Sequence, residues 1–221
     1  MDFASRKKIP SKGSAAKEKF VSQTHPPNMN QTKSTETLLM YVNDVLALER
    51  LIKEAVTGQI KDDDVRADSE TSALLGKIAT CTETRMNELK ELSQALGGGA
   101  GAVKETVAAV AGVFAGLYDM VRKHPVSRML RDDYTALALA STAYSMLYTT
   151  AVALHSDQVA TVAQRGLRKV APLVLQVSHL IPDVVVGELA KDHPDVNHAA
   201  IAAAREATEQ AWSPEGELVH G

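Results

Sequence analysis

One carboxylate and one guanidinium stand where a helical sequence would otherwise place apolar side chains. Glu49 falls in an apolar stripe that runs from Leu38 to Val56 with residues repeating every three or four positions. Arg85 holds an equivalent position among the apolar residues of a second helical stretch. Burying a charged group is costly unless an opposite charge pairs with it. We therefore expect Glu49 and Arg85 to meet in a bundle core.

Three further polar side chains are candidates for the same buried cluster. Thr82 precedes Arg85 by three residues and shares its helix face, while Tyr144 and Tyr148 lie on the expected inward face of a later helix. Their hydroxyls can satisfy lone pairs that an ion pair leaves over. The alternative keeps both charges outside: Glu49 reaches water beyond a helix boundary, and Arg85 extends its long stem from the bundle edge.

Other reactive side chains occur without the companions that chemistry would need. His155 and His179 stand alone on different helices, and the spacing of His193 and His198 matches no common metal motif. Cys81 has no histidine or basic activator nearby in the sequence. The glycine run at residues 97–101 lacks the strand and the lysine of a phosphate loop. We expect no catalytic residue and no cofactor.

Helical periodicity supplies the elements that would position the cluster. The sequence predicts helices over residues 35–59, 65–96, 102–124, 126–154 and 157–190, the last with kinks at Pro172 and Pro182. Short turns join the first to the second and the fourth to the fifth, so each pair forms an antiparallel hairpin. Residues 102–124 can travel the length of a bundle at ~1.5 Å per residue. A short Ala-rich helix is predicted over 195–212.

Composition favours the same all-α class. Of the 221 residues, 45% are hydrophobic but only 4% are aromatic, so the core consists mainly of Ala, Val and Leu, as in closely packed helices. The length suits one domain with tails. We assign residues 1–33 to a disordered basic arm, 34–192 to a helical bundle and 193–221 to a short helix and C-terminal tail.

Charge divides the arm from the body. Residues 1–33 contain seven Lys or Arg and two acidic residues, a net charge of +5, while the remainder carries −8. A lysine-rich arm can contact nucleic-acid phosphates without reading sequence, here through Arg6, Lys7, Lys8, Lys12, Lys17 and Lys19. The acidic body would repel a duplex, so a solvated tail is the alternative interpretation.

A cytoplasmic location is expected. The single cysteine excludes an intrachain disulfide, and no apolar stretch follows the basic N-terminal residues as it would in a secretory signal. The 21 residues from Tyr134 to Leu154 carry no charge and approach the ~20 that cross a bilayer. Ser and Thr dilute this stretch and no other span matches it, so we expect a buried helix and no membrane partner.

Two hairpins joined by one long crossover resemble the ferritin-like superfamily, especially rubrerythrin-like and stress-associated bundles, over residues 35–190. The resemblance implies an inward carboxylate on the first and third core helices and Glu-x-x-His on the second and fourth, together holding two iron or manganese ions. Thr82 and Arg85 stand in place of that Glu and His on the second helix. The third helix has no inward carboxylate after Asp133, and the fourth offers no acid or histidine. The resemblance thus implies a degenerate di-metal site without metal, in which Glu49 is the best residual ligand.

Three functions are consistent with these features. A non-catalytic ferritin-like bundle with a scaffold or stress-related role is favoured, associating as a homodimer through the apolar segment from Val103 to Val121. The second is a metal-binding ferritin-like oxidoreductase with a reduced site on Glu49. The third is a DNA-associating stress protein that uses its lysine-rich arm.

Overall fold

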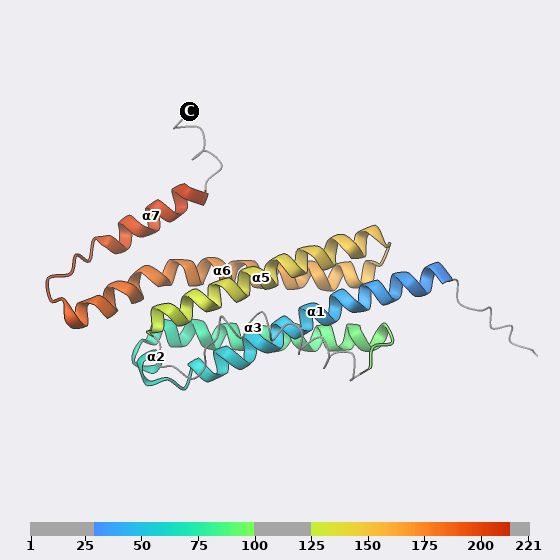
Figure 1. Ribbon diagram of the computed structural model, residues 1–221, viewed down its shortest axis with the longest axis horizontal. Helices are drawn as coiled ribbons and strands as arrows, with labels where there is room; N and C mark the ends of the chain where they lie inside the picture. Colours follow the sequence, from blue (N-terminus) through green and yellow to red (C-terminus); the bar gives the residue numbers. More distant parts are fainter. Residues whose placement is uncertain (1–28, 100–124, 213–221) are drawn as a thin grey trace, which may run out of the picture.

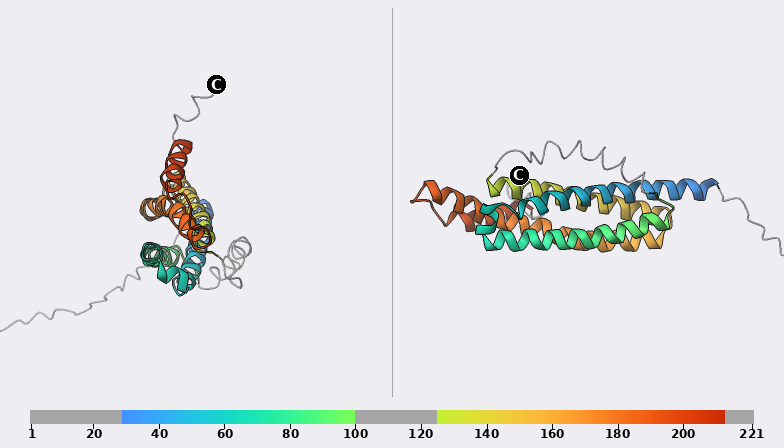
Figure 2. Two further views of the ribbon diagram at one scale, coloured as in Figure 1. Left: turned by 90° about the vertical axis from the view of Figure 1, so that its left-hand side faces the viewer. Right: turned by 90° about the horizontal axis from the view of Figure 1, so that it is seen from below.

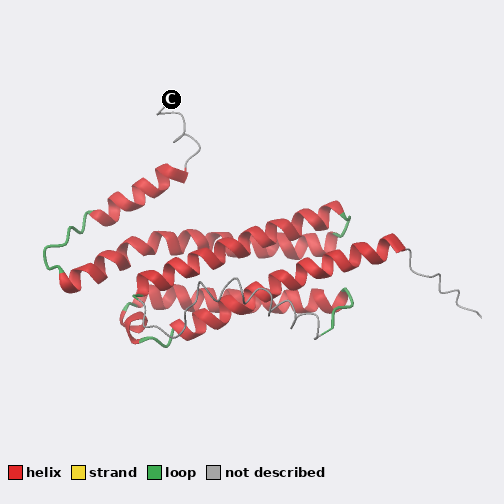
Figure 3. Ribbon diagram, in the orientation of Figure 1, coloured by secondary structure: helices red, strands yellow, loops and turns green. Residues whose placement is uncertain are grey.

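The computed structural model describes residues 29–99 and 125–212, in which all regular secondary structure is helical (Figures 1 and 3). The predicted all-α class is therefore confirmed for these residues. The helices are α1 (Met29–Gln59), α2 (Asp63–Ala67), α3 (Ser69–Ala95), α5 (Val126–Ala153), α6 (Asp157–Asp192) and α7 (Ala200–Trp212). Three predicted parts lie outside the described residues. They are the arm residues expected to contact phosphates, the crossover segment with its expected dimer surface, and the tail after Trp212.

Four long helices pack side by side as two hairpins. α1 contacts α3 and α5, and α6 contacts α5 and α3, so α1 lies diagonally across the bundle from α6 (Figure 2). α3 and α5 run in the same direction, with α3 ending and α5 beginning at opposite ends of the bundle (Figure 1). Every long helix therefore contributes one face to a shared core.

α1 begins earlier than the sequence analysis assigned. Residues 29–33 were placed in the arm, but they are helical. Pro27 is the last strong helix breaker before this point, and no residue between it and Thr35 interrupts a helix once formed. The long first helix then buries its apolar stripe, with Val42, Ile52 and Val56 fully inaccessible.

The turn after α1 contains the short helix α2, which was not predicted. The Asp62 carboxylate accepts a hydrogen bond from the backbone N–H of Asp64 at 2.9 Å and caps α2. Asp68 then accepts hydrogen bonds from the N–H groups of Glu70 and Thr71, at 3.0 and 3.1 Å, and begins α3. We predicted one helix beginning at residue 65. The two aspartate caps, six residues apart, instead begin two separate helices, α2 and α3.

α6 remains one helix of 36 residues through both prolines, so the predicted kinks do not divide it. Pro172 is exposed, and so is Arg168, the residue one turn earlier whose carbonyl loses its helical partner. In the turn before α6, His155 adopts a left-handed φ of 56°. Ser156 stands at the N-cap as predicted, but its side chain forms no capping hydrogen bond.

Two described helices, α5 and α6, are long and apolar enough to cross a membrane, and one third of the residues in each apolar window are buried in the bundle. Only the α5 stretch was expected from the sequence, because it is free of charged residues, whereas the apolar part of α6 contains the charged Asp183. Length and composition are weak indicators here, because core helices of soluble bundles have the same character.

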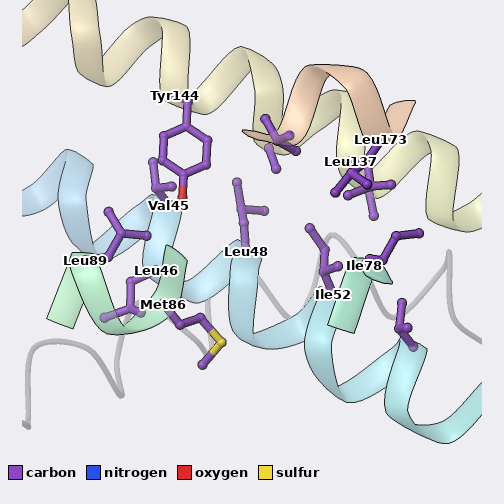
Figure 4. Packing of buried hydrophobic residues seen from close by; sticks show 14 of the residues in the cluster. Val45, Leu46, Leu48, Ile52, Ile78, Met86, Leu89, Leu137, Tyr144 and Leu173 are labelled. Atoms are coloured by element: carbon purple, nitrogen blue, oxygen red, sulfur yellow. The ribbon is translucent and has the colours of Figure 1, made fainter. Parts of the chain in front are cut away.

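Small residues let the second hairpin close tightly. Ala136, Ala140 and Ala151 of α5 and Ala163 of α6 are completely buried. Larger side chains fill the space between the two hairpins, where Leu137, Leu173 and Ile78 meet from three different helices (Figure 4). Close-packed aliphatic residues of this kind give the bundle its stability.

Candidate functional site

The centre of the bundle contains a fully buried ion pair between α1 and α3. Arg85 Nε donates to Glu49 Oε1 at 2.6 Å, and Arg85 Nη2 donates to Glu49 Oε2 at 2.8 Å. Neither side chain is accessible to solvent. Each carboxylate oxygen thus accepts one of two parallel hydrogen bonds, the strongest arrangement of these two groups.

Thr82 completes the local network. It lies one turn before Arg85 on α3, and its Oγ1 accepts a hydrogen bond from Arg85 Nη2 at 3.0 Å. The structure therefore brings together three of the five residues of the expected polar cluster by direct hydrogen bonds: Glu49, Thr82 and Arg85. The shared helix face of Thr82 and Arg85 follows from their three-residue spacing.

The pair keeps Arg85 charged in spite of its surroundings. Burial by itself would lower the pKa of Arg85, but the hydrogen bonds and negative charge of Glu49 raise that pKa above its ordinary value. A guanidinium that remains protonated holds Glu49 in place permanently. The arrangement is a bidentate ion pair that joins α1 to α3 inside the core.

Tyr144 approaches the pair from the opposite hairpin. Its side chain points from α5 toward α1 and α3, among Val45, Leu48 and Leu89 (Figure 4). Burial, reinforced by the Glu49 charge, raises the pKa of Tyr144 well above its usual value, although Arg85 acts in the opposite direction. Neither the Tyr144 hydroxyl nor Arg85 Nη1 has a hydrogen-bond partner within the described chain.

Gly166 of α6 makes room for the Tyr144 ring. A Cβ atom at Gly166 would lie 2.1 Å from Cε1 and 2.5 Å from Cζ of Tyr144, closer than any real contact. Because Gly166 has no side chain, the backbone of α6 can pack directly against the Tyr144 ring. Tyr148, the fifth expected member, is only half-buried one turn further along α5. It packs against the apolar core of the bundle.

The expectation of a single core carboxylate was wrong. Asp133 is 1% exposed and Asp132 is 6% exposed on α5. Asp133 Oδ1 accepts a hydrogen bond from Gln59 Nε2 at 3.1 Å, near the end of α1, and Asp132 pairs with Arg131 at 2.7 Å. The four-, three- and four-residue spacing of Val126, Leu130, Asp133 and Leu137 could have revealed the buried position of Asp133.

A second buried polar contact, which the sequence analysis missed, closes the far end of the first hairpin. Ser93 Oγ donates to Asn43 Oδ1 at 2.9 Å, and both residues are buried. Gly98 folds back onto this contact, with its N–H donating to the Ser93 carbonyl at 2.8 Å. A Cβ atom at Gly98 would lie 2.4 Å from Ser93 Oγ, so this close approach requires glycine.

The family's di-metal ligand set does not fit these residues. The only inward carboxylate at the expected ligand position, Glu49, already accepts hydrogen bonds from Arg85 with both oxygens. Over residues 29–99 and 125–212, no three His, Cys, Asp or Glu side chains gather closely enough to hold a metal ion. A cation at Glu49 would also meet the adjacent guanidinium charge.

The four histidine candidates lie outside this centre, whereas Cys81 lies next to it. His179 is exposed on α6, 3.9 Å from Glu209 of α7. His155 lies in the α5–α6 turn, and His193 and His198 lie between α6 and α7. Cys81 is a free, half-buried thiol one turn before Arg85 on α3.

No known protein family, curated protein or solved structure matches the chain. The class that the fold itself defines is an all-α bundle of two helical hairpins with one additional helix beside it. Its central polar layer joins Glu49 of α1, Thr82 and Arg85 of α3, Tyr144 of α5 and Gly166 of α6.

Proposed function

We propose that this protein is a non-catalytic bundle of the ferritin-like type, with a scaffold role that depends on the shape and surfaces of the helices. One observation carries the proposal: the bidentate pair between Glu49 and Arg85 fills the centre, where a ferritin-like enzyme would hold its metals. A carboxylate whose oxygens are both engaged by a guanidinium has little capacity to bind a cation.

The direction of the helices supports the ferritin-like part of the proposal. α3 and α5 run in the same direction, whereas a simple up-and-down bundle would alternate them. Parallel second and third core helices require a connection along the length of the bundle, which is the connectivity of ferritin-like proteins. The family resemblance adds a stress-related role in the cytoplasm to the proposal.

Metal content tests the proposal directly. We expect protein purified from cells grown with iron and manganese to contain far less than one equivalent of either metal. Unfolding by denaturant should follow the same curve with and without a chelator, because no ligand stabilises the folded state. Two equivalents of bound metal, or a loss of stability on chelation, would establish the metalloprotein alternative instead.

A charge-removal variant sharpens the same test. In Arg85→Met, Glu49 loses its partner, and a latent metal site at this carboxylate would gain affinity. We expect the variant to remain free of metal, since a single carboxylate is too small a ligand set. Thr84→Met, an exposed substitution on the same helix, is the matched control.

A further inference from the structure

An apolar groove of about 650 Å³ lies between α7 and the α5–α6 hairpin. Its walls are mainly aliphatic or aromatic and include Leu175, Ile181 and Val185 of α6 and Ala204, Thr208 and Trp212 of α7. α7 diverges from α6 beyond the loop that joins them (Figures 1 and 2).

The apolar walls of this groove are uncovered. Trp212 is 72% exposed and Leu175 is 59% exposed, the two largest values among the exposed large hydrophobic residues of the described chain. None of the 13 residues of α7 is buried. Helices shorter than ~12–15 residues are marginal in water without tertiary packing, so α7 needs a further surface to cover it.

α7 is held beside the bundle mainly through one polar residue. Arg205 forms a close ion pair with Asp183 of α6, and its Nε donates to the His179 carbonyl at 3.1 Å. This attachment fixes α7 at its middle and leaves its apolar side turned toward the open groove. The helix is thus positioned before any partner arrives, which lowers the entropic cost of binding one.

We propose that the groove is an interface between two copies of this chain, in which the α7 helices lie antiparallel and each occupies the groove of the other copy. The proposal rests on the scaffold function above and specifies its partner. Reciprocal insertion is a two-fold arrangement, in which the same patch serves on both subunits. It would bring α6 and α7 of both copies together as four helices.

The distribution of side-chain size along α7 fits this pairing. Alanines occupy four of the first five positions of α7, namely Ala200, Ala202, Ala203 and Ala204, and the bulky Trp212 occupies its end. Antiparallel pairing about the helix midpoint sets Trp212 against Ala200 of the partner subunit and Ala204 against Thr208 of the partner subunit. Large side chains then face small ones, so the backbones can approach closely.

Helix dipoles and buried area agree with a second copy. Antiparallel pairing opposes the two helix dipoles favourably. A 13-residue helix is ~20 Å long and ~10 Å wide, so embedding half its side surface buries ~300 Å² on the helix and as much on the groove. The contact between the two α7 helices belongs to both insertions and is counted once, so together they bury less than ~1,200 Å², a size typical of weak and transient interfaces.

Sedimentation of the full chain at ~1–100 μM, a range that spans typical association strengths, provides the first test. We expect a dimer that dissociates on dilution. Trp212→Glu and Leu175→Glu should each weaken it at least ~30-fold, as expected for a central interface residue. Val152→Glu is the matched control, because Val152 is 52% exposed at the other end of the α5–α6 hairpin; this variant should remain dimeric.

Trp212 fluorescence provides an independent readout, because it is the single tryptophan of the chain. We expect its emission to shift to the blue, and iodide quenching to decrease, over the same concentrations at which the dimer forms. A dimer that ignores both groove variants would overturn this interface while leaving a scaffold function intact. If sedimentation gives a monomer at every concentration, the proposed dimer is wrong. This holds whether or not iodide quenches Trp212. Two metal equivalents in the protein would refute the scaffold function separately.

Discussion

The centre of the bundle buries charged residues, whereas the α6–α7 groove exposes apolar ones, the reverse of the usual arrangement in a folded protein. Charged Glu49 and Arg85 are fully buried at the centre, whereas Leu175 and Trp212 are exposed at the edge. The buried charges have partners on neighbouring helices, while the exposed apolar residues have no comparable cover within the described chain. The comparison shows that the buried charges are paired within the core, whereas the exposed apolar residues at the edge are the surface that our proposed dimer would cover.

Different physical terms stabilise the two regions. At the centre, the pair's attraction and hydrogen bonds offset the cost of removing two charges from water. In the groove, covering apolar surface would release about 25 cal/mol for each Å². A substitution should therefore act on folding at the centre and on association at the edge.

Separating the buried charges should have the largest effect. We expect Glu49→Gln or Arg85→Met to lower the free energy of unfolding by about 3–5 kcal/mol, because the remaining charge is stranded in the core. The double variant should lose much less than the sum. Denaturant unfolding of both single variants and the double variant measures this coupling.

An exposed pair on the same two helices provides the control. Lys53 of α1 and Glu83 of α3 lie 2.8 Å apart with the opposite order of charges, but both remain in contact with solvent. Lys53→Met and Glu83→Gln should change stability only slightly, since water screens such pairs. Equal losses at both pairs would contradict the distinction between core and surface.

Filling the space at Gly166 should have an intermediate effect. Gly166→Ala forces the Tyr144 ring to move, and we expect a loss of about 1–3 kcal/mol from overpacking. The loss should shrink in a Tyr144→Ala background, where the clashing ring is absent. Gly187→Ala, with open space on the same helix, should be neutral or slightly stabilising in the same thermal or denaturant assay.

Alkaline pH should expose the burial of Tyr144. The unfolded residue ionises near pH 10.0, but its pKa is raised well above this value in the folded protein, first by burial and then by Glu49. The folded state therefore retains a proton that the unfolded state loses, and stability falls as pH rises above 10.0 by up to about 1.4 kcal/mol per pH unit.

Tyr144→Phe should reduce this alkaline loss while changing stability little at neutral pH, because the hydroxyl has no hydrogen-bond partner in the described chain. Tyr134→Phe on the same helix is the control, as this residue is only half-buried. Denaturant midpoints between pH 8 and pH 11 give the comparison. An identical pH profile for wild type and Tyr144→Phe would contradict it.

Loosening α7 should have the smallest effect on the bundle as a whole. Arg205→Gln removes the ion pair with Asp183, yet α7 buries no residue, so the unfolding midpoint of the bundle should change little. Protease cleavage between α6 and α7 should accelerate instead, because local opening becomes easier. Arg168→Gln, an exposed substitution on α6, should leave cleavage unchanged.

Much of the helical architecture could be predicted from local patterns. The apolar repeat through Val45, Ile52 and Val56 identified α1, and the glycines after Leu96 marked the end of α3. The predictions were wrong at the start of α1 and at the boundary between α2 and α3. The cap at Asp68 divided the second predicted helix, and the stretch from Met29 continued the first.

The central site was only partly predictable for a geometric reason. An ideal period of 100° per residue places Thr82 and Arg85 on one face, but small phase errors accumulate along a helix of 28 residues such as α5. Asp133 was therefore not counted among the inward residues, although it is buried.

The sequence by itself determined the helical class, the two hairpins and the helix faces that carry Glu49 and Arg85, because these follow from contacts within a few residues along the chain. Only the tertiary structure decided that Arg85 reaches both oxygens of Glu49, that Gly166 admits the Tyr144 ring, and that α7 leaves a groove beside α6. Each of these depends on the distance and angle between helices far apart in sequence. Those quantities are set by the packing of the whole core, which no local pattern encodes.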